Sequence, residues 1–106
     1  MNIKALKAYA RLDFQGNGAT RKQWLCLNKV WQQESHWNYK AIGDKTSNGR
    51  AYGIAQALPA NKMSDIKKDW HTNPYTQILW GIKYIRLHWR MNACAALRNE
   101  RVRGYY

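Results

Sequence analysis

The residue of this 106-residue chain best placed to do chemistry is Glu34, the single acid in the stretch 20–38. It continues an apolar series that repeats at steps of three and four residues, a spacing that puts side chains on one face of a helix. The series consists of Trp24, Leu27, Val30 and Trp31. A carboxyl on an apolar face is partly removed from water, which raises its pKa and suits it to general acid catalysis. We therefore expect Glu34 to be a catalytic acid.

Many glycosidases use a second carboxylate as a base or nucleophile beside the acid. The sequence offers only a weak candidate for this second carboxylate. The nearest candidate is Asp44, which stands beside Gly43 in a polar segment where an Asp more often forms a turn. We expect the other acids to be ordinary surface charges, namely Asp13, Asp65, Asp69 and Glu100. The three histidines lack the spacing of metal ligands, so we expect no metal site and no cofactor.

The elements that must position Glu34 are helices. Thr20 and Gln23 have the spacing of a capping box, and Asn73-Pro74 and Asn92 mark two later helix starts. Four or five helices are expected, over residues 2–12, 20–38, 59–66, from 73 onward and 94–98. Asn48-Gly49 suits the turn of a hairpin, but its flanks do not alternate. The fold class is therefore mainly α, a small all-α single domain over residues 1–106 with at most a minor β-hairpin.

The charge of the chain points to a polyanionic partner. Eighteen Lys and Arg against six acids give a net charge of +12, which fits nucleic acid, an anionic membrane or an anionic cell wall. The basic residues are spread along the chain, which favours a wall over specific nucleic acid. We expect no transmembrane segment, and no secretory signal is visible at the start of the chain. A non-catalytic module that binds wall glycan or nucleic acid is the competing class of function.

The two cysteines, Cys26 and Cys94, are too far apart for a CxxC redox motif or a zinc cluster. They are either two buried thiols or one disulfide, and composition alone leaves both open. A disulfide would close a loop of nearly seventy residues, worth roughly 4 kcal/mol in the chain-entropy model. It would also indicate use outside a reducing cytoplasm.

Three blocks of sequence, taken in order, carry a resemblance to a known family. They are Trp31 to Asn38 (WQQESHWN), Ala51 to Pro59 (AYGIAQALP), and the pairs Asn73-Pro74, Gln77-Ile78, Trp80-Gly81 and Tyr84-Ile85. Together they resemble lytic transglycosylase-like domains of the lysozyme-like superfamily, in the small form of actinobacterial secreted proteins and phage tail proteins. The resemblance runs from about Gln23 to Tyr106, so residues 1–19 lie outside it.

The resemblance implies cleavage of the β-1,4 bond between N-acetylmuramic acid and N-acetylglucosamine in peptidoglycan. Glu34 would protonate the leaving oxygen and then take the proton of the muramyl C6 hydroxyl, closing a 1,6-anhydro sugar. One carboxyl then serves both steps, and a lysozyme-type muramidase (a hydrolase) that uses Asp44 or a held water is the closest rival. The residues implied to bind substrate are Ser35, Tyr52, Gln56 and Tyr84.

The resemblance also implies a disulfide between Cys26 and Cys94 and peptidoglycan glycan strands as the partner, and we expect a monomer. The implied location is extracellular or facing the cell wall, including a phage virion. The chain departs from the family at His36, where Gly is usual, and at Leu87-His88-Trp89, where Arg-Tyr-Gly is more common. It departs again at Leu97, in a region where an aromatic supports the acid. The expected substitutes for that aromatic are Tyr84, Tyr105 and Tyr106.

Overall fold

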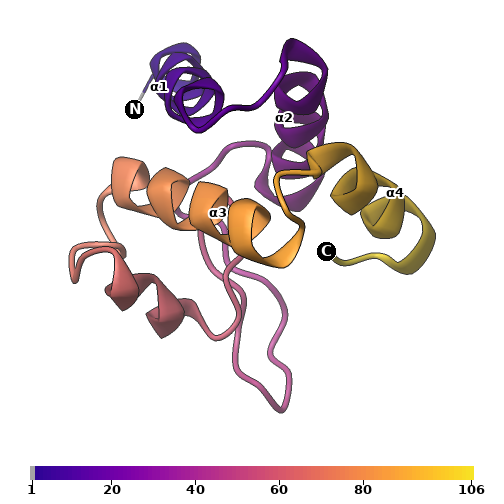
Figure 1. The fold of residues 1–106 in the computed structure, drawn as a ribbon. Coiled ribbons are helices and arrows are strands. Elements are labelled where there is room, and N and C mark those ends of the chain that lie inside the picture. Colours follow the sequence, from indigo (N-terminus) through magenta and orange to yellow (C-terminus); the bar gives the residue numbers. More distant parts are fainter. Residues whose placement is uncertain (1) are drawn as a thin grey trace.

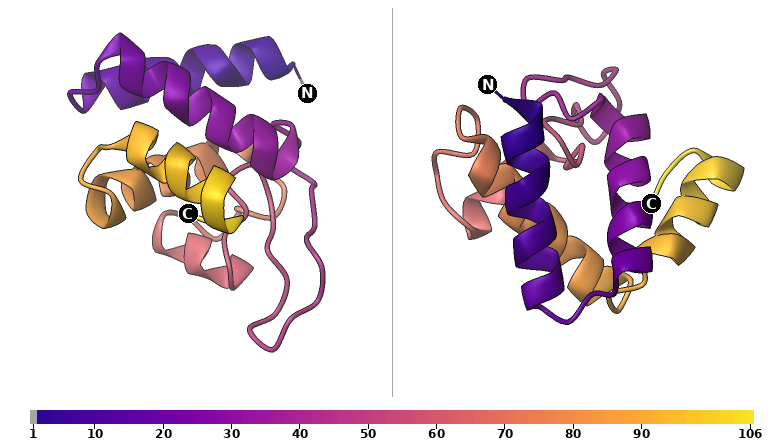
Figure 2. Two further views of the ribbon diagram at one scale, coloured as in Figure 1. Left: turned by 90° about the vertical axis from the view of Figure 1, so that its right-hand side faces the viewer. Right: turned by 90° about the horizontal axis from the view of Figure 1, so that it is seen from above.

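The computed structural model describes residues 2–106, and its regular structure is helical (Figure 1). Helix α3 crosses the middle of the molecule, with α1 packed on one side and the short 3-10 helix η1 on the other (Figure 1). Helices α2 and α4 pack side by side (Figure 2). The helices are α1 (Ile3–Gly16), α2 (Arg21–Ser35), η1 (Ala60–Asp65), α3 (Pro74–His88) and α4 (Ala93–Arg103).

The starts of the α-helices are fixed by polar side chains, which the sequence predicted for α2, α3 and α4. In each helix the cap residue accepts a hydrogen bond from a free backbone N–H of the first turn. The four caps are Asn2, Thr20, Asn73 and Asn92. The capping box at α2 is only half formed, because the Gln23 side chain turns away from Thr20 and bonds to Asn92 instead.

The helix ends differ from those expected. Helix α1 runs on to Gly16 because Phe14 completes its buried face with Leu6 and Ala10. Helix α4 runs on to Arg103 and stops at Gly104, whose φ of 79° is left-handed and natural for glycine.

Helix α2 ends at Ser35, three residues before the predicted end. The two residues that follow, His36 and Trp37, have φ of 52° and 58° and cannot continue a right-handed helix. Trp37 is nevertheless buried, lies edge-on to Trp31 with ring centroids 5.2 Å apart, and donates from Nε1 to Asn28 Oδ1. Burial of this indole holds the chain in the sharp turn that leaves α2.

The core forms around α2, whose expected apolar face is buried from Trp24 to Trp31. Helix α3 crosses close to this face at Gly81, where an added Cβ would collide with the Trp31 ring. The absence of a side chain at position 81 therefore lets α3 approach the helix that carries Glu34.

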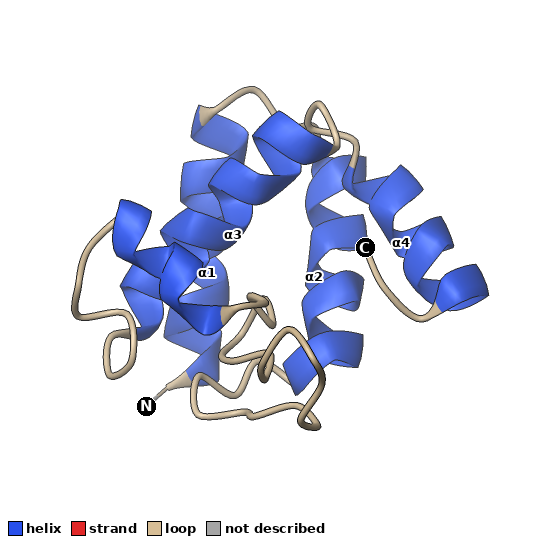
Figure 3. Ribbon diagram, turned by 90° about the horizontal axis from the view of Figure 1, so that it is seen from below, coloured by secondary structure: helices blue, strands red, loops and turns tan. Residues whose placement is uncertain are grey.

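The long connection from α2 to η1 is irregular and projects from the helices (Figure 2). Within residues 2–106 its only β-structure is a set of isolated bridges, one of which joins Thr46 and Gly49 around the Asn48 turn. Figure 3 shows helices and loops without strands. The predicted fold class, mainly α with a minor hairpin, is confirmed. None of the helices described has the length and apolar character that crossing a membrane demands.

Candidate active site

The last turn of α2 places Glu34 in the wall of a cavity of about 330 Å³. The rest of the wall comes from the loop before η1, from η1 and α3, and from the segment after α4. Its other residues are Ala51, Ala55, Gln56, Leu58, Lys62, Trp80, Tyr84, Gly104, Tyr105 and Tyr106. Glu34 is the single acid in this lining, to which segments far apart in the sequence contribute.

The Glu34 carboxyl is held in its protonated form. Burial raises its pKa from the ordinary 4.5 to about 9, aided by a hydrogen bond to the Glu100 side chain and by repulsion from its charge. Two carboxyls in contact share a proton, because bringing both together as anions is unfavourable. The Glu34 carboxyl is therefore protonated and neutral at neutral pH, which is the state that a general acid requires.

Glu100, on α4, is the partner of Glu34 that the sequence analysis missed. We expected a surface charge, but Glu100 is half-buried, and its Oε2 is buried with no N–H or hydroxyl donor from residues 2–106. Two ionised carboxylates can only accept hydrogen bonds. The hydrogen bond between Glu34 and Glu100 therefore requires a proton on Glu34. Glu100 follows Ala93, Ala96 and Leu97 at steps of three and four residues, so it continues a buried apolar helix face just as Glu34 does. The helix predicted from the sequence ended at residue 98, so Glu100 was not placed on it.

Tyr106 is the last residue of the chain and lines the same cavity as Glu34. Its hydroxyl donates to the Ala55 carbonyl at 2.6 Å and accepts from Trp31 Nε1 at 3.1 Å. Burial, and next the negative charge of Glu34, raise the pKa of Tyr106 well above its ordinary value. Its hydroxyl proton is committed to Ala55, so Tyr106 shapes the wall beside Glu34 rather than donating to the carboxyl.

Gln56 and Tyr84, two of the four expected substrate-binding residues, line this cavity. Gln56 Nε2 donates to the carbonyls of Ala41 and Gly53, which fixes its side chain within the loop. The Tyr84 hydroxyl donates to the Tyr106 carbonyl at 2.7 Å, so it ties α3 to the segment after α4. Their contact with substrate stays a prediction.

Ser35 and Tyr52, the other two, are buried outside this lining. Ser35 Oγ donates to the Ile54 carbonyl at 2.7 Å and so joins the end of α2 to the loop. The Tyr52 hydroxyl donates to the His71 carbonyl at 3.0 Å, and its ring stacks on the imidazole of the same residue. Both side chains support the segment that carries Gln56. Their predicted part in substrate binding is untested.

The buried side-chain amide of Gln77, on α3, holds the loop that carries Gln56 against that helix. Its Oε1 accepts from the backbone N–H of Ile54, and its Nε2 donates to the carbonyls of Tyr39 and Trp70, each at 2.9 Å. Gly53, with φ of 83°, packs so closely on this amide that a Cβ there would collide with it. In the sequence, Gln77 is a polar residue on the apolar face of α3, and its role in fixing the loop was not predicted.

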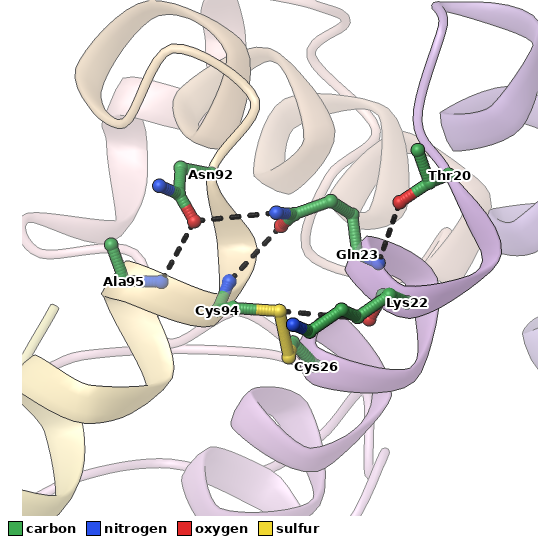
Figure 4. Close-up of a disulfide and its surroundings, with 7 residues drawn as sticks. All are labelled: Thr20, Lys22, Gln23, Cys26, Asn92, Cys94 and Ala95. Carbon is green, nitrogen blue, oxygen red and sulfur yellow. Dashed lines mark hydrogen bonds between the residues drawn. A yellow bond between two sulfur atoms is a disulfide. The ribbon is translucent and has the colours of Figure 1, made fainter.

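The expected disulfide between Cys26 and Cys94 is present and joins α2 to the start of α4 (Figure 4). Gln23 adds to this junction, because its Nε2 donates to Asn92 Oδ1 and its Oε1 accepts from the Cys94 backbone N–H (Figure 4). Since α2 carries Glu34 and α4 carries Glu100, this cross-link holds the two helices that supply the carboxyl pair.

Removing the disulfide is expected to lower the free energy of unfolding by about 4 kcal/mol, because the unfolded chain loses a closed loop of almost seventy residues. Urea denaturation of the oxidised and the reduced protein measures the difference. Replacing both cysteines by serine should reproduce the reduced midpoint. Equal midpoints for all three samples would show that the junction at Gln23 suffices without the covalent bond.

Asp44 does not take part in this arrangement. It is exposed in the projecting loop and is not among the residues that line the cavity of Glu34. Across residues 2–106, no three His, Cys, Asp or Glu side chains come together as a candidate metal site. The chemistry of the cavity thus depends on the half-buried Glu34 carboxyl, its partner Glu100 and the aromatic wall.

Comparison with known proteins gives one match. The profile of the family described as "Transglycosylase SLT domain" matches residues 14–105, which is most of the chain. Neither a curated protein nor a solved structure matches.

Proposed function

The chain belongs to the transglycosylase SLT domain family of the lysozyme-like superfamily, and we propose from this that Glu34 is its single catalytic acid and base. The family assigns a peptidoglycan-degrading function of the lytic transglycosylase type. The specific reaction we propose is cleavage of the β-1,4 bond between N-acetylmuramic acid and N-acetylglucosamine, with a 1,6-anhydromuramyl product.

In the first step Glu34 gives its proton to the glycosidic oxygen as the bond from that oxygen to muramyl C1 breaks. The carboxylate left behind lies in a partly buried site next to Glu100, where its negative charge is poorly stabilised. It is therefore a strong base. In the second step it takes the proton of the C6 hydroxyl while that oxygen bonds to C1, which closes the anhydro ring and restores the acid. No water is consumed.

The observation that carries this proposal is that Glu34 is the one acid among the residues lining its cavity. A hydrolase with two carboxylates needs a base or nucleophile about 5 Å or more from the acid, facing the same substrate. Neither Asp44 nor Glu100 is among the residues that line the cavity, so neither faces a substrate held there. A single carboxyl that acts twice fits this arrangement.

The products of purified peptidoglycan distinguish the two reactions. The lytic transglycosylase leaves anhydro ends that are lighter by one water than the reducing ends left by a muramidase. We expect mass spectrometry of the wild-type digest to show anhydromuramyl ends. A digest that contains only hydrated, reducing ends would assign the chain to the hydrolases, with a held water as the nucleophile.

We propose further that residues 1–106 act as one domain and as a monomer at the cell wall. A peptidoglycan-degrading domain works in an extracellular or wall-facing context, where the disulfide is stable. The net charge of +12 favours attraction to an anionic wall. A secreted enzyme meets these conditions, and so does a phage virion component.

A further inference from the structure

A second cavity, of about 410 Å³, continues from the cavity of Glu34. The two cavities share Lys62, Trp80 and Tyr84 as walls. The second is completed by Asp65 of η1 and by residues of α3, so it lies between these two helices. A substrate that reacts at Glu34 can therefore extend along these shared walls into the second cavity.

The aromatic rings of the second cavity are stacked on one another. Trp80, Tyr84 and His88 lie four residues apart on α3, with centroid separations of 5.3 and 4.8 Å and interplanar angles of 19° and 13°. At this spacing the outer two rings cover opposite faces of Tyr84. Trp80 is itself buried, and Trp89 lies edge-on to His88. A sugar ring needs a free aromatic face, and the rings in this cavity are largely occupied by each other.

The charges of the second cavity are suited to an acidic ligand. Two ammonium groups, from Lys62 and Lys83, face one carboxylate, from Asp65. Within residues 2–106 the one ion pair joins Lys67 to Asp69, so neither lysine of the cavity is neutralised by a carboxylate. Unpaired ammonium groups beside an apolar wall attract carboxylates and distinguish them from neutral sugars.

We propose that the second cavity binds the acidic stem peptide of peptidoglycan, with Lys83 and Lys62 as the groups that meet its carboxylates. This inference rests on the proposed function. The stem peptide is attached to the lactyl group of muramic acid, one of the two sugars joined by the bond that is cleaved. When that bond lies at Glu34, the peptide begins beside the cavity of Glu34 and the adjoining space is open to it.

Binding to a cleavage-deficient protein tests the assignment directly. The two probes are the GlcNAc–MurNAc disaccharide with its tetrapeptide stem and the same disaccharide without it, titrated by calorimetry into the Glu34→Gln variant. We expect the stem to tighten binding about tenfold, and adding Lys83→Gln to reduce this advantage by about two- to fivefold, the usual worth of a partly exposed charge contact. The affinity for the stem-free disaccharide should not change.

The matched control is Lys29→Gln, which removes the same charge from an exposed position of α2 that lines neither cavity. It should leave the stem advantage intact. Equal affinity for the two probes, an equal loss for both on Lys83→Gln, or an equal loss in the Lys29 control would each overturn the assignment. Digestion by the wild-type protein is a separate readout. If stem-dependent binding through Lys83 occurs without cleavage, the proposed function fails and the peptide site stands.

Discussion

Replacing Glu34 with Gln is expected to lower the rate of peptidoglycan cleavage at least about a thousandfold, because one side chain is lost as both the acid and the base. The amide has nearly the same size and can donate an N–H to the Glu100 carboxylate, so the buried contact is kept. The fold and glycan binding should therefore survive. Release of soluble muropeptides from purified sacculi measures the rate, and thermal melting checks the fold.

The control for this variant is Asp44→Asn, which removes the other carboxylate considered for the reaction. Asp44 is exposed and lies outside the cavity lining, so its loss should leave cleavage within about twofold of wild type, as for most surface substitutions. Near-normal cleavage by the Glu34 variant would refute the role given to Glu34. A large loss in the Asp44 variant would favour a two-carboxylate hydrolase.

Replacing Glu100 with Gln is expected to move the alkaline limit of activity to lower pH by roughly one to two units. Glu34 must be protonated to act, so activity falls as the pH rises through its pKa. In the wild type the Glu100 carboxyl helps to raise that pKa. In the variant the charge is gone and an amide N–H stabilises the ionised Glu34, so the pKa falls. The rate should be close to normal near pH 5 and reduced by about two- to tenfold near pH 8.

Stability gives this prediction a readout that does not depend on catalysis. A carboxyl whose pKa is raised by folding stabilises the protein below its unfolded pKa and loses that contribution as the pH rises through the folded value. Wild-type melting temperature should therefore decline between about pH 5 and 9, and the Glu100→Gln variant should decline less. Asp44→Asn, which removes an exposed acid outside the cavity lining, serves as the control for charge. An unshifted activity profile in the Glu100 variant would remove Glu100 from the mechanism.

The parts of the fold that follow local rules were predictable from the sequence. The cap residues and the apolar stripe of α2 depend on neighbours within four residues, so the starts of three helices and the position of Glu34 followed. The end of α2 did not follow, because the turn at His36 is imposed by burial of Trp37 against Asn28 and Trp31, which lie more than four residues back along the chain. A rule that looks along the chain cannot see such a tertiary cause.

The same distinction explains which contacts of the site residues could not be predicted. Glu100 reaches Glu34 through the packing of α4 on α2, which a helix ended too early concealed. Tyr106 arrives because the chain turns back after Gly104, and nothing local indicates where it lands. The capping-box spacing predicted a local hydrogen bond for the Gln23 side chain, but its amide instead bonds to Asn92 and Cys94 at the start of α4. In all three cases the partner lies more than fifty residues away.

The turn after α2 bears on how Glu34 is held. His36 and Trp37 occupy a left-handed region that costs ordinary residues about 1 kcal/mol or more each. This cost is offset by the buried indole of Trp37, which the core cannot release without opening. The turn beside Glu34 is therefore fixed by the folding of the whole molecule. The Glu34 carboxyl is thereby preorganised, and in the proposed reaction an arriving substrate would meet a proton donor that needs no rearrangement to act.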